Sequence, residues 1–122
     1  MISFQERLRE RTKQFALMII RLVRLLPNNA EGWVVGKQLL HSGTSVAANY
    51  RAADCARSHP EFLAKMGIAV EEADETVFWL ELLQAADVVA EPAISPVLIE
   101  ARELVRIFSA SYHTAKARCR RE

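Results

Sequence analysis

Apolar residues recur at steps of three and four along nearly the whole chain, and only three short segments interrupt them. Within residues 4–26 the repeating positions include Phe15, Ile19, Leu22 and Leu26. This spacing places side chains on one face of an α-helix. Sheet proteins need many turn residues, whereas this chain of 122 residues has four glycines and four prolines. The pattern therefore predicts an all-α protein.

The three interruptions set the expected helix boundaries. Pro27 ends the first helix, because the residue before a proline is pushed out of the α region, and Asn28 or Asn29 can cap the next helix. The sequences 58–60 and 95–96 place a capping residue before a proline, which is typical of a helix start. The sequence predicts helices over residues 4–26, 31–57, 60–86 and 96–118, a loop over 87–96, and a basic tail over 116–122.

The second of these helices contains two glycines, Gly36 and Gly43, that could break it. Both share a face with Leu40, Ala47 and Tyr50, and small residues on a packing face let a neighbouring helix approach closely. We therefore expect the helix to continue through them.

Four long helices joined by short links pack most simply as an antiparallel up-down-up-down four-helix bundle. The length of 122 residues fits a single domain. No apolar run reaches the ~18–20 residues of a membrane span, and the first residues lack the apolar segment of a secretory signal. We expect a cytoplasmic protein without membrane contact.

Charge is divided unequally among the expected helices, although the formal net charge is only +1. Residues 1–26 hold six basic and two acidic side chains, residues 92–122 hold six and three, and residues 61–91 hold one and eight. One interpretation is that the basic helices pack beside the acidic one, within a chain or between subunits. The other is a nucleic-acid surface on the first and last helices.

The nucleic-acid interpretation rests on a defined set of basic residues. Such contacts would be electrostatic and mostly independent of base sequence. The candidates for binding RNA or DNA are Arg7, Arg9, Arg11, Lys13, Arg21, Arg24, Arg102, Arg106, Arg118, Arg120 and Arg121.

No combination of residues typical of catalysis or metal binding is found in the sequence. The cysteines form no Cys-x-x-Cys pair, and no Glu has a His three residues later, as di-iron bundles require. Nothing resembles a phosphate-binding loop, and no acid is placed to orient His41 beside Ser42. We expect a non-enzymatic protein without a metal or cofactor.

Polar residues occupy helix positions that should be buried. A buried carboxylate is costly unless it is paired, and Lys37 and Arg51 are candidate partners. The set is interpreted as a structural network that fixes helix register, with a ligand pocket as the alternative. Its members are Ser42, Ser45, Asn49, Tyr50, Arg51, Glu72, Glu75, Thr76 and Trp79.

Two segments resemble the signatures of a known family. Residues 33–51, WVVGKQLLHSGTSVAANYR, and residues 72–83, EADETVFWLELL, are similar to motifs of the four-helix bundle proteins encoded in intervening sequences of bacterial large-subunit ribosomal RNA genes. The resemblance extends from about Phe15 to Tyr112. The chain departs from the pattern at Ala52, where Glu is common, and at Glu71, where Lys is common.

The resemblance implies an antiparallel four-helix bundle that assembles into a homopentameric ring. A related branch, the accessory variability protein of diversity-generating retroelements, is a basic pentamer that binds nucleic acid and a reverse transcriptase. For most of the family the role is unknown, and no catalytic residue is carried over. We therefore expect an oligomeric assembly or binding module that buries Trp33, Phe78 and Trp79, with nucleic-acid binding as the alternative and an enzyme using Glu72 or Glu75 as the third choice.

Overall fold

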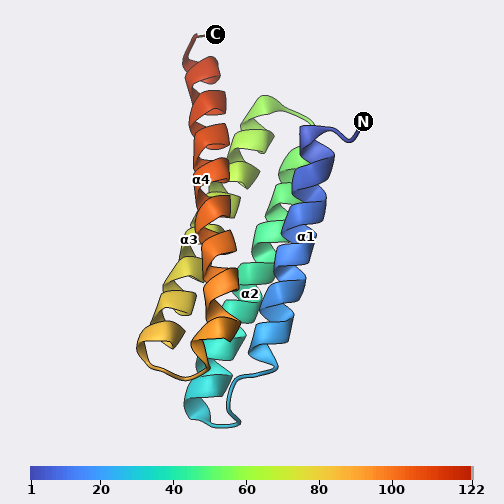
Figure 1. Ribbon diagram of the computed structural model, residues 1–122. Helices are drawn as coiled ribbons and strands as arrows, with labels where there is room; N and C mark the ends of the chain where they lie inside the picture. Colours follow the sequence, from blue (N-terminus) through green and yellow to red (C-terminus); the bar gives the residue numbers. More distant parts are fainter. Residues whose placement is uncertain (122) are drawn as a thin grey trace.

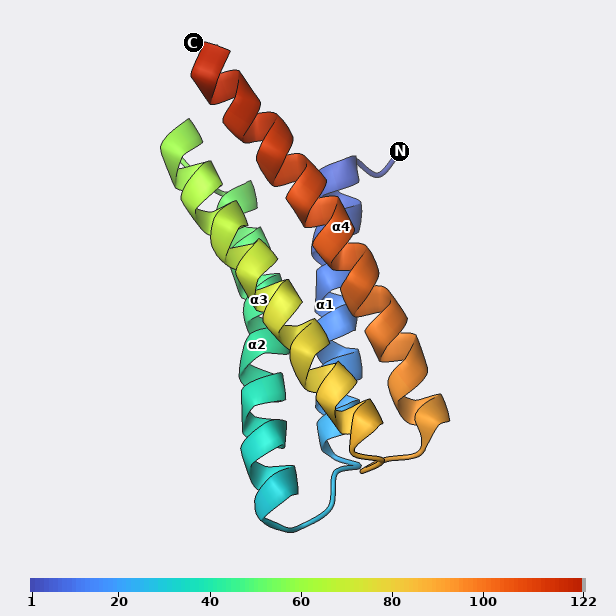
Figure 2. The same cartoon turned by 90° about the vertical axis from the view of Figure 1, so that its left-hand side faces the viewer.

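The computed structural model describes the backbone of residues 1–121 and the side chains of residues 1–118. It consists of four helices whose neighbours in sequence run in opposite directions, as the ribbon views show (Figures 1 and 2). The predicted all-α, up-down-up-down four-helix bundle is confirmed. Its helices are α1 (Phe4–Val23), α2 (Ala30–Asp54), α3 (His59–Ala85) and α4 (Glu91–Arg121).

The first three helices begin at capping residues. The Ser3 hydroxyl accepts a hydrogen bond from the backbone N–H of Glu6, and the Glu6 carboxylate accepts one from the N–H of Ser3. Asn29 caps α2, and Ser58 caps α3 ahead of Pro60. These side chains satisfy backbone donors that the first turn leaves without partners.

The ends of α1, α2 and α4 differ from the sequence prediction, and α4 continues to Arg121 where an end at position 118 was predicted. α1 ends at Val23, three residues earlier than expected, and α2 ends at Asp54 instead of position 57. The residues before Pro27 form a hydrogen-bonded turn, with the N–H of Leu26 donating to the carbonyl of Val23. A proline restricts the residue before it, and the chain here leaves the helix earlier still.

The predicted loop over 87–96 is wrong, because α4 already begins at Glu91 and Pro96 lies inside it. Pro92 is the second helical residue, where a missing N–H costs nothing. At Pro96 one backbone hydrogen bond is absent. The surrounding turn buries Ile94, Val97 and Leu98 almost completely, and this burial offsets the loss.

α3 ends in a tight turn that leads into the connection to α4. The N–H of Asp87 donates to the carbonyl of Gln84 and the N–H of Val88 to that of Leu83, which is the hydrogen-bond pattern of a Schellman motif. Asp87 has a φ of 58°. It therefore occupies the left-handed position where glycine is favoured.

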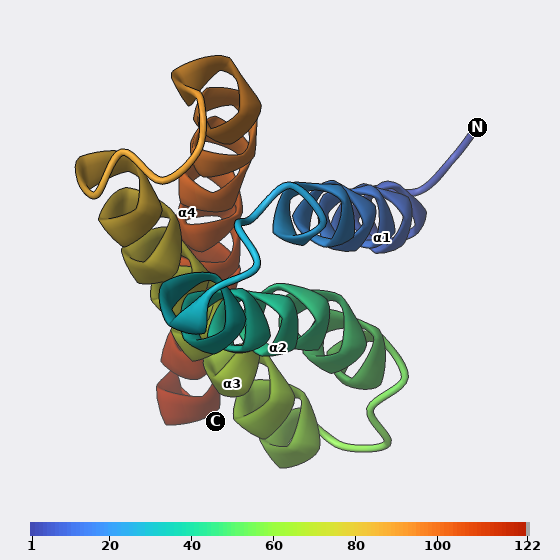
Figure 3. The ribbon, with the colours of Figure 1, turned by 90° about the horizontal axis from the view of Figure 1, so that it is seen from below.

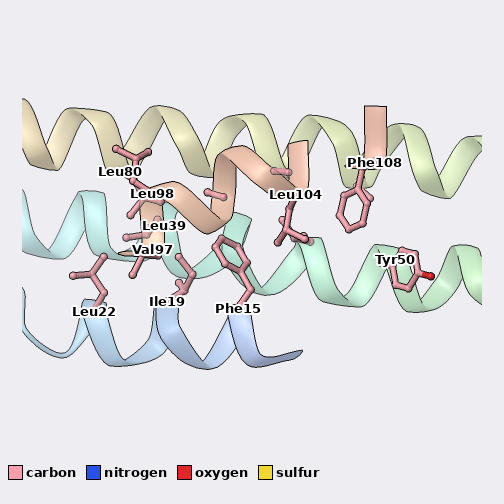
Figure 4. Close-up of a cluster of buried hydrophobic side chains, with 14 of the residues drawn as sticks. Phe15, Ile19, Leu22, Leu39, Tyr50, Leu80, Val97, Leu98, Leu104 and Phe108 are labelled. Atoms are coloured by element: carbon pink, nitrogen blue, oxygen red, sulfur yellow. The ribbon is translucent and has the colours of Figure 1, made fainter. Parts of the chain in front are cut away.

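The core lies between all four helices (Figure 4). Phe15 and Ile19 of α1 point toward α2, and Phe108 of α4 stacks on Tyr50 with ring centroids 5.4 Å apart. α2 continues through both of its internal glycines, as predicted. A Cβ at Gly43 would lie 2.7 Å from Ile19 Cγ1, so glycine permits the close approach of α1 and α2.

The four helices are not equally well packed against one another. α1 contacts α2 extensively and α4 only slightly. Figure 3, a view along the bundle from below, shows α1 beside α2 and apart from α4. A bidentate ion pair connects α1 to α4, with Arg11 Nε 2.8 Å and Nη2 2.7 Å from the two carboxylate oxygens of Glu100. Among the described residues, no helix is both long and apolar enough to cross a membrane.

Candidate interaction surfaces

Two fully buried hydroxyl groups join α2 to α3. Thr76 Oγ1 lies 2.9 Å from Ser42 Oγ and 2.7 Å from the carbonyl oxygen of Glu72, while Ser42 Oγ lies 3.3 Å from the carbonyl oxygen of Leu39. Both hydroxyls therefore have partners without contact with water. The pair links Ser42 of α2 directly to Thr76 of α3.

The other polar residues of α2 differ in their exposure to solvent. Ser45 and Asn49 are half-buried, and Asn49 Nδ2 donates to the Ser45 carbonyl. Tyr50 is buried, and this burial raises the pKa of its phenol to about 12. Arg51 is exposed and lines a groove beside α1.

The prediction that Lys37 and Arg51 pair with the carboxylates of α3 is wrong. Lys37 is exposed, like Arg51, and within the side chains described up to Arg118 neither residue forms an ion pair. Both residues line grooves that α2 forms with α1, so their side chains are turned away from α3.

Glu72 of α3 is a half-buried carboxylate. Its Oε2 atom is buried and, among the residues that the structure describes, has no hydrogen-bond partner. Burial raises the pKa of the Glu72 carboxyl, and the neighbouring charge of Glu75 raises it further, while His41 opposes the shift. Glu75 itself accepts a hydrogen bond of 3.3 Å from Nε1 of the half-buried Trp79. Within the part of the chain that the structure describes, no three His, Cys, Asp or Glu side chains are grouped to hold a metal ion.

α3 is apolar on two opposite sides. One side forms part of the core through residues such as Met66, Ala73 and Leu80. The other side faces solvent and repeats at steps of four and three, which places its residues in one row along the helix. We call this row the outer stripe of α3; it consists of Ala64, Ile68, Glu71, Glu75, Phe78 and Leu82.

The outer stripe exposes a large apolar area. Ile68 is 38% exposed, Phe78 54% and Leu82 41%. This row is not among the sequence predictions, although the four-and-three spacing of its residues from position 64 to 82 is visible in the sequence. A helix that is apolar on both sides is normally covered on both sides.

Two grooves lie one above the other between α1 and α2, and we call the two together the seam groove. Its upper part has a volume of about 580 Å³, a floor of small residues that includes Ala16, Ala47 and Ala48, and a rim that carries Lys13 and Arg51. The lower part, of about 300 Å³, is lined mainly by apolar residues of both helices. They include Val23, Leu26, Trp33 and Leu40.

Four of the candidate nucleic-acid-binding residues are engaged in ion pairs. The partners are Asp54 for Arg9 at 3.0 Å, Glu100 for Arg11 at 2.7 Å, Glu81 for Arg102 at 3.1 Å and Glu103 for Arg106 at 2.6 Å. The hydrogen bonds that Arg11 donates to the Glu100 carboxylate raise the pKa of the Arg11 guanidinium. These four are less available to phosphates than the sequence alone suggests.

The remaining candidates are distributed over α1 and the end of α4. Arg7, Lys13, Arg21 and Arg24 are exposed, and among the side chains of residues 1–118 they form no ion pair. Arg118 is exposed near the end of α4. The side chains of Arg120 and Arg121 and the end of the basic tail lie outside the described residues.

Comparison with known families decides what kind of bundle this is. The model of the 23S rRNA-intervening sequence protein family matches residues 6–110. The chain belongs to this family. A solved structure that is similar to it is a protein of unknown function from the S23 ribosomal protein family of Bacteroides thetaiotaomicron. The two share 31% sequence identity over 89% of this chain and 97% of the other, with a TM-score of 0.81.

The family resemblance expected from the two sequence signatures is thereby confirmed. Neither match names a catalytic activity. No protein of curated function matches the chain. The function of this family member is therefore inferred from the geometry of its exposed surfaces.

Proposed function

We propose that this protein is a non-enzymatic binding module that works as a homo-oligomer. The observation that carries the proposal is the outer stripe of α3, where Ile68, Phe78 and Leu82 form one row on the solvent side of a helix already buried on its other side. Burying such a row in a subunit contact removes apolar surface from water. Identical chains can do so in a closed ring. Five subunits is the number that the family resemblance suggests.

The absolute mass of the purified chain in solution tests this proposal. Light scattering or sedimentation equilibrium at several protein concentrations should return a discrete multiple of the 13.8 kDa chain, with five copies as the expected value. A particle of one chain at all concentrations would overturn the oligomeric module. A discrete multiple other than five would keep the module and correct the number.

Nucleic-acid binding is the second candidate function. It is favoured by four exposed basic residues, because an oligomer repeats this set in every subunit. They are Arg7, Lys13 and Arg21 on α1 and Arg24 at its C-terminal cap. Contacts to phosphates release counterions, so the binding should weaken steeply as salt is raised. A reverse transcriptase as a further partner is suggested only by the related retroelement branch.

A gel-shift titration with RNA and with duplex DNA, at low and moderate salt, tests the second function. We expect binding at low salt that Arg21→Glu combined with Arg24→Glu weakens at least about tenfold, since each lost phosphate contact lowers affinity and the salt slope. Arg106→Glu is the matched control, because that guanidinium already binds Glu103. Absence of binding at low salt would leave a protein partner as the target of the module.

A further inference from the structure

We propose that the outer stripe of α3 docks into the seam groove of a second copy of the chain. This inference rests on the proposed homo-oligomer and names the two surfaces that meet in it. The contact is head-to-tail, because a helix ridge on one subunit meets a groove made by different helices on the next. Contacts of this kind close into rings when the rotation between subunits permits it.

Charge complementarity is the first argument for this occupant. The outer stripe has Glu71 and Glu75 at its centre, and the rim of the seam groove has Lys13 and Arg51. Within the described side chains, neither of these two cations forms an ion pair. The groove thus offers two unengaged positive charges to a ridge with two central negative charges.

The groove also holds two carboxylates, Glu6 and Glu10, which keep their charge but lie nearer the start of α1 than Lys13 does. Glu6 accepts from the backbone N–H of Ser3 at the start of α1, and Glu10 accepts from Gln14 Nε2. Arg9, the remaining basic residue there, is held by Asp54 at 3.0 Å.

Matching heights along the bundle are the second argument. The contact between Ser42 and Thr76 aligns α2 with α3, and the approach of Ile19 to Gly43 aligns α1 with α2. With a rise of ~1.5 Å per residue, Glu71 then lies within ~6 Å of the height of both Lys13 and Arg51.

The apolar residues follow the same order. By the same alignment, Phe78 lies at the height of Leu40, and Leu82 lies at that of Gly36, both of which line the lower part of the groove. A rotation about an axis parallel to the bundle preserves height. A ring with that axis therefore brings the acidic half of one stripe to the basic upper groove and the apolar half to the lower groove.

The shape of the groove fits a helix. Its upper floor is made of alanines, which allow a second helix to approach closely. Its lower wall includes Trp33, which is 62% exposed and whose Nε1 donates to Asn28 Oδ1. An aromatic side chain fixed in this way presents a large apolar face to an incoming Phe78 or Leu82.

Charge reversal on each surface, followed by their combination, tests the pairing. The stripe variant carries Glu71→Lys and Glu75→Lys, and the groove variant carries Lys13→Glu and Arg51→Glu. We expect each to require at least about tenfold more protein for half-maximal assembly, because like charges then face each other across the contact. The variant with all four changes restores opposite charges and should assemble as the wild type does.

Two control variants make the same charge change away from the contact. Asp74→Lys alters an exposed residue of α3 off the outer stripe, and Arg21→Glu alters an exposed residue of α1 that does not line the groove. Both should assemble normally. Far-UV circular dichroism and thermal unfolding of each variant, measured at one protein concentration, separate loss of assembly from loss of folding.

The outcomes distinguish this inference from the proposed function. The pairing is overturned, and the homo-oligomer kept, if the stripe and groove variants assemble as the wild type does. The same holds if the variant with all four substitutions does not recover assembly. A wild-type chain that is monomeric overturns the homo-oligomer itself. Weakened assembly in both variants with recovery in their combination supports the pairing.

Discussion

Replacing Gly43 with alanine tests how closely α1 and α2 are packed. The added Cβ would lie 2.7 Å from Ile19 Cγ1, 2.9 Å from Cγ2 and 3.1 Å from Cβ. Ile19 is fully buried, and a β-branched side chain in a helix has one strongly preferred rotamer. Ile19 therefore cannot turn away, and the helices must separate or the side chain must leave its rotamer.

The expected free-energy change follows from two opposing effects. Overpacking of a well-packed core costs about 1–3 kcal/mol. Alanine favours the helix over glycine by up to ~1 kcal/mol. We expect Gly43→Ala to lower the free energy of unfolding by up to about 2 kcal/mol, measured by urea denaturation at a fixed protein concentration.

Gly67→Ala is the matched control on α3. Its Cβ would meet only Tyr112, at 3.5 Å, which is an ordinary contact. We expect this variant to gain up to ~1 kcal/mol from helix propensity alone. If Gly43→Ala were stabilised as much as Gly67→Ala, the argument from close helix approach would be refuted. Adding Ile19→Val to Gly43→Ala should recover part of the loss.

Four further changes test other contacts by urea denaturation. Thr76→Val removes the buried hydrogen bond to Ser42 and should lower stability by about 1 kcal/mol; unchanged stability would contradict its role. Arg11→Ala removes the bidentate contact between α1 and α4 and should cost up to about 1 kcal/mol, less at high salt. Asp87→Gly relieves the left-handed backbone conformation and should gain roughly 1 kcal/mol; a loss would contradict this. The raised pKa of Glu72 means that the folded chain binds the carboxyl proton more tightly than the unfolded chain does. The free energy of unfolding of the wild type should therefore fall as pH rises from the ordinary carboxyl pKa through the raised one. Glu72→Gln should make this fall smaller.

Local rules predicted most of the fold because helix ends depend on neighbouring residues. Asn29 and Ser58 cap their helices as the sequence indicated. Pro96 misled the prediction because its local cost is offset by contacts made elsewhere. Burial of Ile94 and Leu98 against the other helices extends α4 toward its N-terminus, and no local pattern reports such burial.

The polar sites show the same division between local and tertiary information. Periodicity placed Ser42 and Thr76 on inward faces, where the structure finds them. It could not give the rotation of α2 relative to α3, and this rotation decides whether Arg51 meets a carboxylate of α3. Arg51 lines the groove beside α1 instead, and Glu72 Oε2 has no hydrogen-bond partner within the described part of the chain.

The slight contact between α1 and α4 has a consequence for the protein's motions. α1 is held mainly by α2, so it can detach while α3 keeps its contacts with α2 and with α4. Amide hydrogens of α1 should then exchange with solvent faster than those in the middle of α3. Because the seam groove exists only while α1 is in place, a neighbour seated in it would hold α1 down. The amide hydrogen exchange of α1 would then slow as the protein concentration rises and more subunits assemble.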